Sequence, residues 1–286
     1  MARKLGAATL SIGVNVALLA SKMFVAFITG SIGLYAESAH SFFDLLASVL
    51  AYLGIRKAEE PEDHTHHFGH EKFENLSSLL QALLITGTAF VVIFEAYQKI
   101  SSPSGVEFSE AGILLMLVSI PVTLFTSRYL GEIARKEGSS ALEADSAHFT
   151  TDVISSVSVL VGLILVRSGY PIGDPLGAAV VGAVMLYISV ELLQRSFLVF
   201  MDFSPDRKTM SAIEKVLQGE QGAKRITRYH KIRARIAGSR VLVDLHIHLP
   251  HKTSVVVGHQ IAHDIEGRIL RDVPLVKEVS VHIEPD

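Results

Sequence analysis

The chain has 286 residues, of which 49% are hydrophobic and 19% are charged, and its formal net charge at pH 7 is −3. Soluble domains carry charge on nearer a quarter of their residues, so this sequence is too apolar for an ordinary soluble domain. The weakly negative charge excludes a broadly basic nucleic-acid-binding protein. The sequence has no cysteine, which excludes disulfides, thiolate zinc sites and thiol catalysis, and it has 13 histidines.

Six apolar stretches follow one another in the first two thirds of the chain. They lie at residues 5–29, 31–55, 76–100, 108–130, 144–166 and 175–200. Arg3 and Lys4 before the first stretch resemble the start of a signal peptide, but this stretch is long and further ones follow. As a helix it is roughly 37 Å long, enough to cross a hydrocarbon core of about 30 Å. We therefore predict an all-α bundle of six transmembrane helices over residues 1–203.

The distribution of Lys and Arg predicts the orientation of these helices, because cytoplasmic loops are enriched in both residues. An even number of spans places both termini on one side of the membrane. The cations expected on that side are Arg3, Lys4, Arg56, Lys57, Lys72, Arg128, Arg135 and Lys136. The opposite side has only Lys99 and Arg167. We therefore expect a multi-pass protein of the cell membrane with both termini in the cytoplasm.

The tail, residues 204–286, is richer in charge and has shorter apolar runs. Ser204, Pro205 and Asp206 are typical of a helix start, and Thr253 or Ser254 is placed to cap a second helix. The elements expected are a helix to residue 217, strands at 226–236 and 241–249, a helix to residue 270, and a strand at 276–283. Three strands with two helices indicate a compact α+β domain, of ferredoxin-like or metallochaperone-like type.

Spans two and five share a motif, Ala-acid-Ser-Ala-His-x-x-x-Asp, at residues 36–44 and 144–152. Ionisable residues at membrane depth are costly and therefore indicate function. Residues four apart lie on one helix face, so His40 points with Asp44, and His148 points with Asp152. Two imidazole nitrogens and two carboxylate oxygens around one point fit four-coordinate Zn²⁺ better than Mg²⁺, Ca²⁺ or Cu(I).

Other polar residues in the spans have more ordinary interpretations. An interhelical hydrogen bond would explain a single His/Asp pair, but two matched pairs favour a metal site. Glu37 and Asp145 are either outer carboxylates of that site or interhelical hydrogen-bonding groups. Asn15 is expected to hydrogen-bond between helices, and Lys22 to reach the headgroups or to pair across helices.

With its six spans, its paired His/Asp motifs and its charged tail, the sequence resembles the cation diffusion facilitator family of metal/proton antiporters over essentially its whole length. The resemblance implies a homodimer in the lipid bilayer, in which each protomer carries a transport site at His40, Asp44, His148 and Asp152. It implies a transporter and not an enzyme, which exports Zn²⁺ by alternating access with protons as the counter-substrate. Within the family, His-x-x-x-Asp in both spans accompanies zinc preference, whereas Asp at the first position of span two accompanies a wider choice of ions.

The resemblance also implies an accessory zinc site in the loop between spans two and three. The positions that match its ligands are Asp63, His66 and His70. His64 and His67 are additional histidines that could replace them. The alternative is a loop that collects metal loosely without a defined site.

A binuclear zinc site at the dimer contact of the tail is the third site that the resemblance implies. The matching positions are His230, His246, His259, His282 and Glu284, although the family has Asp at the last of these. His246 and His248 alternate along a strand, and we expect His246 at the site and His248 on the other face. His263, one turn after His259, is expected to be solvated.

Two other classes of function compete with transport. A membrane metalloenzyme is disfavoured, because His70-Glu71-Lys72-Phe73-Glu74 lacks the second His of a His-Glu-x-x-His motif. No Gly-rich P-loop supports ATP-driven pumping. A membrane metal sensor without net flux remains an alternative, and so does an exporter of Cd²⁺, Co²⁺, Fe²⁺ or Mn²⁺.

Overall fold

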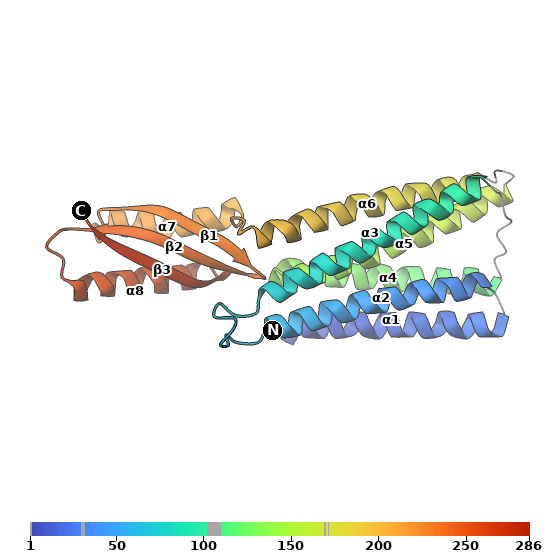
Figure 1. Cartoon of the computed structure of the whole chain (residues 1–286), viewed down its shortest axis with the longest axis horizontal. Helices are drawn as coiled ribbons and strands as arrows, with labels where there is room; N and C mark the ends of the chain where they lie inside the picture. The colour runs from blue at the N-terminus through green and yellow to red at the C-terminus, as the bar shows by residue number, and fades with distance from the viewer. Residues whose placement is uncertain (1, 30–31, 102–109, 169, 171) are drawn as a thin grey trace. The chain divides into compact units, whose positions relative to one another are not determined.

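The computed structural model describes residues 2–29, 32–101, 110–168, 170 and 172–286, and it divides into two compact units, Met1–Phe197 and Leu198–Asp286. Each of the six apolar stretches forms one long helix (Figure 1). The helices are α1 (Ala2–Thr29), α2 (Ile32–Ala58), α3 (Lys72–Ser101), α4 (Glu110–Glu137), α5 (Ser140–Arg167) and α6 (Gly173–Phe200). Two predicted starts, Ser31 and Phe108, lie outside the described residues.

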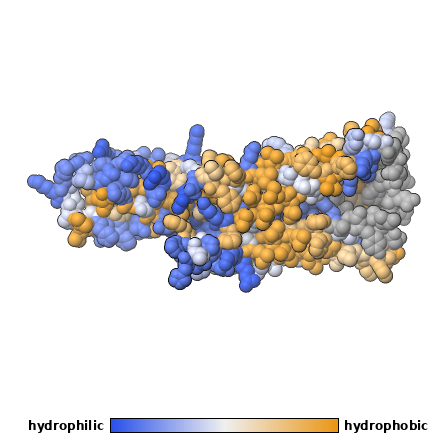
Figure 2. Space-filling view, viewed as in Figure 1, coloured by the Kyte–Doolittle hydropathy of each residue, from blue (hydrophilic) through white to orange (hydrophobic). Residues whose placement is uncertain are grey.

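Length and composition make four helices of the described chain able to cross a membrane. Their spans are Arg3–Ile28, Lys72–Ser101, Ile113–Glu137 and Pro175–Phe200. The remaining two helices, α2 and α5, have similar lengths of 27 and 28 residues but carry the two polar motifs. Figure 2 shows hydrophobic residues over the helices of the first unit and mostly hydrophilic residues over the second unit. Such a broad apolar exterior is typical of a protein that lies in lipid.

The helices of the first unit pack through small and hydroxyl-bearing residues. Helix α2 packs against α1, α3 and α5, and α4 packs against α1 and α5. A Cβ atom added at Gly54 of α2 would lie 2.3 Å from the Cβ of Ser77 of α3. The Ser11 hydroxyl of α1 donates to the Ser48 hydroxyl of α2 at 2.6 Å. In lipid the hydrophobic effect does not drive helices together, so they associate through close packing and interhelical hydrogen bonds.

The second unit has the predicted order of helix, strand, strand, helix and strand. Its elements are α7 (Arg207–Gly222), β1 (Arg228–Ala237), β2 (Arg240–Leu249), α8 (Val255–Asp272) and β3 (Val276–Pro285). The sheet order is β1-β2-β3, with β1 antiparallel and β3 parallel to β2. Asp206 caps α7 by accepting from the Thr209 backbone N–H at 3.0 Å, and Ser254 caps α8.

Alternate residues of β2 face the core of this unit. Val241, Val243 and Leu245 are buried together with Ile213 of α7 and Ile265 of α8. The even-numbered residues of β2 therefore lie on the sheet face away from these helices, because side chains alternate along a strand. Histidines 246 and 248 are both even-numbered, so this face is where the tail gathers its imidazoles.

A bulge in β1 lies directly beside this face. The β1–β2 register shifts between His230 and Arg233, and Lys231 has a positive φ of 49°. Bulges bend a strand and change the direction in which nearby side chains point. His230 pairs with His246 in the register immediately before the bulge, so these two imidazoles lie side by side.

Candidate metal centres

The two His/Asp motifs meet inside the helical unit. Asp44 Oδ1 lies 2.9 Å from His148 Nε2 and 3.7 Å from His40 Nε2. One ligand atom each from His40, Asp44 and Asp152 lies within 4.8 Å of the other two. Asp44 is 4% exposed and His148 is 3% exposed. The structure therefore brings all four predicted residues together, with two from α2 and two from α5.

A buried polar network adjoins this cluster. Asn15 of α1 donates to the Asp44 backbone carbonyl at 3.3 Å and to the Ser48 hydroxyl at 2.8 Å. Ser48 in turn donates to Asp145 Oδ1 at 2.9 Å. Asp145 is fully buried, and its Oδ2 has no hydrogen-bond partner among the described residues. Asp145 and Asn15 thus join α1, α2 and α5, whereas the side chain of Glu37 lies outside the described residues.

Lys22 of α1 places a cation next to the motif of α2. Its Nζ donates to the Ser41 hydroxyl at 2.7 Å. Ser41 is buried, and in the sequence it directly follows His40. Lys22 therefore pairs across helices, which is one of the two expectations for it. Sequence reasoning gave Lys22 no part in the site, although a lysine in an apolar span is itself a functional signal.

The loop between α2 and α3 forms a compact cluster at Asp63, His66 and His70. Asp63 Oδ1 lies 3.3 Å from His66 Nδ1, and Asp63 Oδ2 lies 3.2 Å from His70 Nε2. His70 Nδ1 lies 3.0 Å from the Pro61 carbonyl, which fixes the ring so that Nε2 faces Asp63. In the described part of the chain this buried Nε2 makes no well-aligned hydrogen bond, and its contact with Asp63 Oδ2 is an ion-pair distance only. An imidazole held at one nitrogen with the other unsatisfied is the usual geometry of a metal ligand.

The electrostatics of this loop keep Asp63 ionised. The Thr65 hydroxyl, together with the Thr65 and His66 backbone N–H groups, holds the pKa of the Asp63 carboxyl far below its usual range. His67 Nε2 lies 3.2 Å from the His64 carbonyl, so these two histidines contact each other. Among the described residues, the donors of Asp63, His66 and His70 lie within 4.8 Å of one another, and the part of His64 and His67 stays open.

In the tail, Glu284 of β3 lies among imidazoles from all three strands. His246 Nδ1 is 2.7 Å from Glu284 Oε1, and His282 Nε2 is 3.8 Å from the same oxygen. His230 Nε2 is 3.7 Å from Glu284 Oε2. The hydrogen bond with His246 lowers the pKa of Glu284, and partial burial lowers the pKa of His230. A carboxylate and neutral imidazoles are the protonation states that bind a metal.

The expectation that His248 lies on the other face is wrong. His248 Nε2 lies 3.1 Å from Glu284 Oε2 and 3.2 Å from His230 Nδ1. The physical reason is the period of a strand, since residues two apart point to the same face. His248 therefore shares the face of His246, and it is only 4% exposed.

Helix α8 carries the two remaining candidates. The rings of His259 and His263 stack with centroids 6.3 Å apart, and His263 Nδ1 lies 3.3 Å from Glu266. Both side chains are exposed. Among the described contacts, none connects His259 with the cluster around Glu284, so its part in that site stays a prediction.

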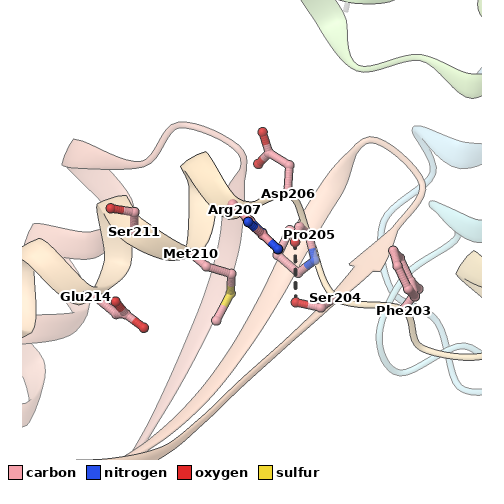
Figure 3. A pocket seen from close by; sticks show the side chains of 8 residues that line it. All are labelled: Phe203, Ser204, Pro205, Asp206, Arg207, Met210, Ser211 and Glu214. Carbon is pink, nitrogen blue, oxygen red and sulfur yellow. Dashed lines mark hydrogen bonds between the residues drawn. The ribbon is translucent and has the colours of Figure 1, made fainter.

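A pocket of about 550 Å³ lies elsewhere in the second unit, at the start of α7. Figure 3 shows its lining, in which the Ser204 hydroxyl donates to the Pro205 carbonyl at 3.4 Å. Its lining residues are Phe203, Ser204, Pro205, Asp206, Arg207, Met210, Ser211 and Glu214. The lining has no histidine, and of its two acids, Asp206 and Glu214, the first is already used as a helix cap. None of the three groups of converging metal-ligand side chains among the described residues lies in this pocket.

Family models match nearly the whole chain. Residues 8–201 match the cation efflux transmembrane domain, and residues 205–286 match the cation efflux protein cytoplasmic domain. The cation-efflux pump FieF of Shewanella oneidensis is 29% identical over 96% of this chain and 92% of its own. An uncharacterized transporter of Synechocystis sp. is 31% identical over 97% of this chain and 89% of its own.

These matches cover both units and the elements that carry the His/Asp motifs. A further uncharacterized transporter, from Methanocaldococcus jannaschii, is 28% identical over 96% of each chain. Members of the matched family are membrane transporters and not enzymes. The chain belongs to the cation diffusion facilitator family of cation efflux transporters.

Proposed function

We propose that the chain is a Zn²⁺/H⁺ antiporter that exports zinc from the cytoplasm by alternating access. In this proposal α1 to α6 all cross the membrane, both termini are cytoplasmic, and the chain works as a homodimer. The excess of Lys and Arg expected on the side of the termini supports the orientation. The match of the tail to the cation efflux cytoplasmic domain supports a cytoplasmic position for the tail.

The observation that carries the proposal is the meeting of two helices at Asp44. This carboxylate contacts the imidazoles of His40 and His148, and Asp152 completes the cluster. Two nitrogen and two oxygen ligands suit Zn²⁺ and its neighbours in the first transition series. We infer that these four residues form the transport site.

The exchange needs only competition at this site. Zinc binds when His40, His148, Asp44 and Asp152 are without protons, because protonated groups do not ligate a metal. After the helices shift so that the site faces outward, protons from the more acidic side displace the ion. Histidine suits this exchange, since its unperturbed pKa of about 6.5 is near working pH. Zinc and protons cannot occupy the same atoms together, so their movements are coupled.

Two accessory zinc sites belong to the same proposal. The loop site uses Asp63, His66 and His70, whose donors already converge. The tail site uses His230, His246, His282 and Glu284, with His259 as a predicted further ligand. A tail that takes up zinc when the cytoplasmic concentration rises would report that concentration to the dimer.

A broader exporter is the second candidate. The relatives named cation-efflux pumps carry names that specify no single metal. Imidazole and carboxylate ligands also accept Cd²⁺, Co²⁺, Fe²⁺ and Mn²⁺. A third candidate, a sensor that binds metal without flux, differs from both because it has no transport under a proton gradient.

Zinc flux in sealed vesicles tests the proposal. The purified chain is placed in liposomes with an acidic interior, Zn²⁺ is added outside, and uptake is followed with an internal zinc dye. We expect uptake that accelerates with the pH gradient and falls to background in Asp152→Ala. Asp272→Ala, at an exposed position of α8, is the matched control and should transport as the unmodified chain does.

Each rival has its own result in this assay. Equal uptake by Asp152→Ala and the unmodified chain would contradict the assigned site. Binding of zinc without uptake at any gradient would indicate the sensor. Equal uptake of zinc and manganese would indicate the broader exporter.

A further inference from the structure

We propose that His248 is a metal ligand of the tail and that, with His230, it holds an ion at the Oε2 side of Glu284. The resemblance did not include His248 among the ligands, and the sequence-based expectation placed it on the other face of the strand. This inference rests on the proposed binding of zinc by the tail. It adds one imidazole ligand, so that each oxygen of Glu284 has two imidazoles beside it.

The two oxygens of Glu284 face different imidazoles. Oε1 lies 2.7 Å from His246 Nδ1 and 3.8 Å from His282 Nε2. Oε2 lies 3.1 Å from His248 Nε2 and 3.7 Å from His230 Nε2. One carboxylate thus has a pair of imidazoles at each oxygen. This arrangement suits a carboxylate that bridges two ions, with His246 and His282 on one and His230 and His248 on the other.

The fold holds His248 in place for this role. Residues 248 and 284 are register partners in the parallel pair of β2 and β3. His248 Nδ1 lies 3.3 Å from the Pro285 carbonyl, and Arg228 Nη2 lies 3.5 Å from the same nitrogen. Both contacts are at Nδ1, which leaves Nε2 as the nitrogen that faces Glu284. A ligand fixed at its outer nitrogen is oriented for metal before the ion arrives.

Burial separates His248 from a surface histidine. Its side chain is 5% exposed, whereas the side chain of His282 is 63% exposed. Burying an imidazole next to a carboxylate and a second imidazole gains little for packing. An ion at this point would satisfy all three polar groups together.

The competing explanation is that His248 only orients Glu284 by donating a hydrogen bond. Glutamine tests this directly, because its amide can donate to the carboxylate but has no imidazole nitrogen. His248→Gln should therefore keep zinc binding if the role is orientation, and should lose it if the role is ligation.

The experiment measures zinc binding by the tail within the full chain. Asp152→Ala and His70→Ala together remove a transport ligand and a loop ligand, and leave the tail cluster intact. Zinc affinity and stoichiometry are then measured by competition with a chelating dye. We expect His248→Gln and His248→Ala to weaken tail binding at least about tenfold. His263→Ala, at an exposed histidine of the same unit, should leave binding unchanged.

X-ray absorption at the zinc edge gives a second measurement on the same samples. We expect fewer imidazoles per zinc in His248→Gln than in the control, with unchanged circular dichroism. Binding by His248→Gln as tight as that of the control, with the same imidazole count, would overturn the inference. A tail that takes up no zinc at all would overturn both this ligand and the proposed tail site, whereas transport by the intact chain would still stand.

Discussion

The helical unit and the tail both gather His and acidic residues, but they place them in different surroundings. Asp44 and His148 are 4% and 3% exposed within a bundle of mostly apolar helices. The side chains of Glu284 and His230 are 27% and 36% exposed on one face of a sheet. The difference is one of degree, because the side chain of His40 in the first cluster is 34% exposed and that of His248 in the second is 5% exposed. An ion in the first cluster would lie between two helices, whereas an ion in the second would lie on one face of a sheet.

In the proposed function, the two clusters do different work. A buried site releases its ion only when the surrounding helices move, which is what alternating access requires. A half-exposed site equilibrates with the local concentration, which is what a sensor requires. We therefore propose that the placement of similar ligands, between two helices or on one face of a sheet, separates transport from sensing in this chain.

The largest effect should come from removing the shared carboxylate of the buried cluster. Asp44→Ala deletes the group that contacts both His40 and His148, and we expect zinc transport in vesicles to fall at least about 100-fold. Glu284→Ala removes the corresponding carboxylate of the tail and should leave measurable transport while tail zinc binding is lost. Equal zinc transport by Asp44→Ala and Glu284→Ala would contradict the assignment of transport to the cluster at Asp44 and not to the tail.

A smaller effect should follow from changing a ligand type without removing it. His40→Asp replaces a nitrogen ligand with oxygen, which favours harder ions such as Mn²⁺. We expect the preference for zinc over manganese in vesicle uptake to fall about tenfold, equivalent to about 1.4 kcal/mol. The same exchange at His263, outside both clusters, should leave selectivity unchanged. An unaltered preference in His40→Asp would mean that His40 does not ligate the transported ion.

The smallest effect should come from the cap of α7. Asp206 accepts from the Thr209 backbone, and Asp206→Ala should lower the free energy of unfolding of the tail by about 1 kcal/mol. The hydroxyl and the backbone N–H of Thr209 lower the pKa of Asp206. This stabilisation is therefore present above the unfolded pKa of about 3.9 and is lost as pH falls through the folded value.

Hydrogen exchange of the α7 amides in the full chain measures this effect. Faster exchange in Asp206→Ala at neutral pH, with the difference vanishing in acid, is the expected result. Transport should be unaffected, because the cap contacts neither cluster. A difference that grows as the pH falls would contradict the sign of the pKa shift.

Much of the fold was predictable because the sequence has two clear hydrophobic patterns: long apolar runs in the first two thirds and alternation in the strands of the tail. Six long apolar runs separated by polar residues predict six helices, and the structure has one helix at each. The strands of the tail follow from their alternation and from Gly238, which has a positive φ of 61° in the turn between β1 and β2. The number of helices that cross the membrane is harder to predict from hydropathy, because α2 and α5 carry polar residues within their length.

The candidate sites were predictable to different degrees. His40, Asp44, His148 and Asp152 stand out because polar residues are rare in their surroundings, and helix spacing alone pairs them. His248 was expected on the wrong face of the sheet. Polar residues are common in the tail, so composition does not single out its ligands, and only the two-residue period of the strand places His248 beside His246. Lys22 contacts Ser41, and Ser48 contacts Asn15 and Asp145, through helix packing that no local pattern specifies.

Anomalous X-ray diffraction at the zinc edge, from crystals of the full chain grown with zinc, tests the central claim most directly. We expect a zinc peak between α2 and α5, within ligand distance of His40, Asp44, His148 and Asp152. Zinc peaks in the loop and tail with none between these two helices would contradict the assigned transport site.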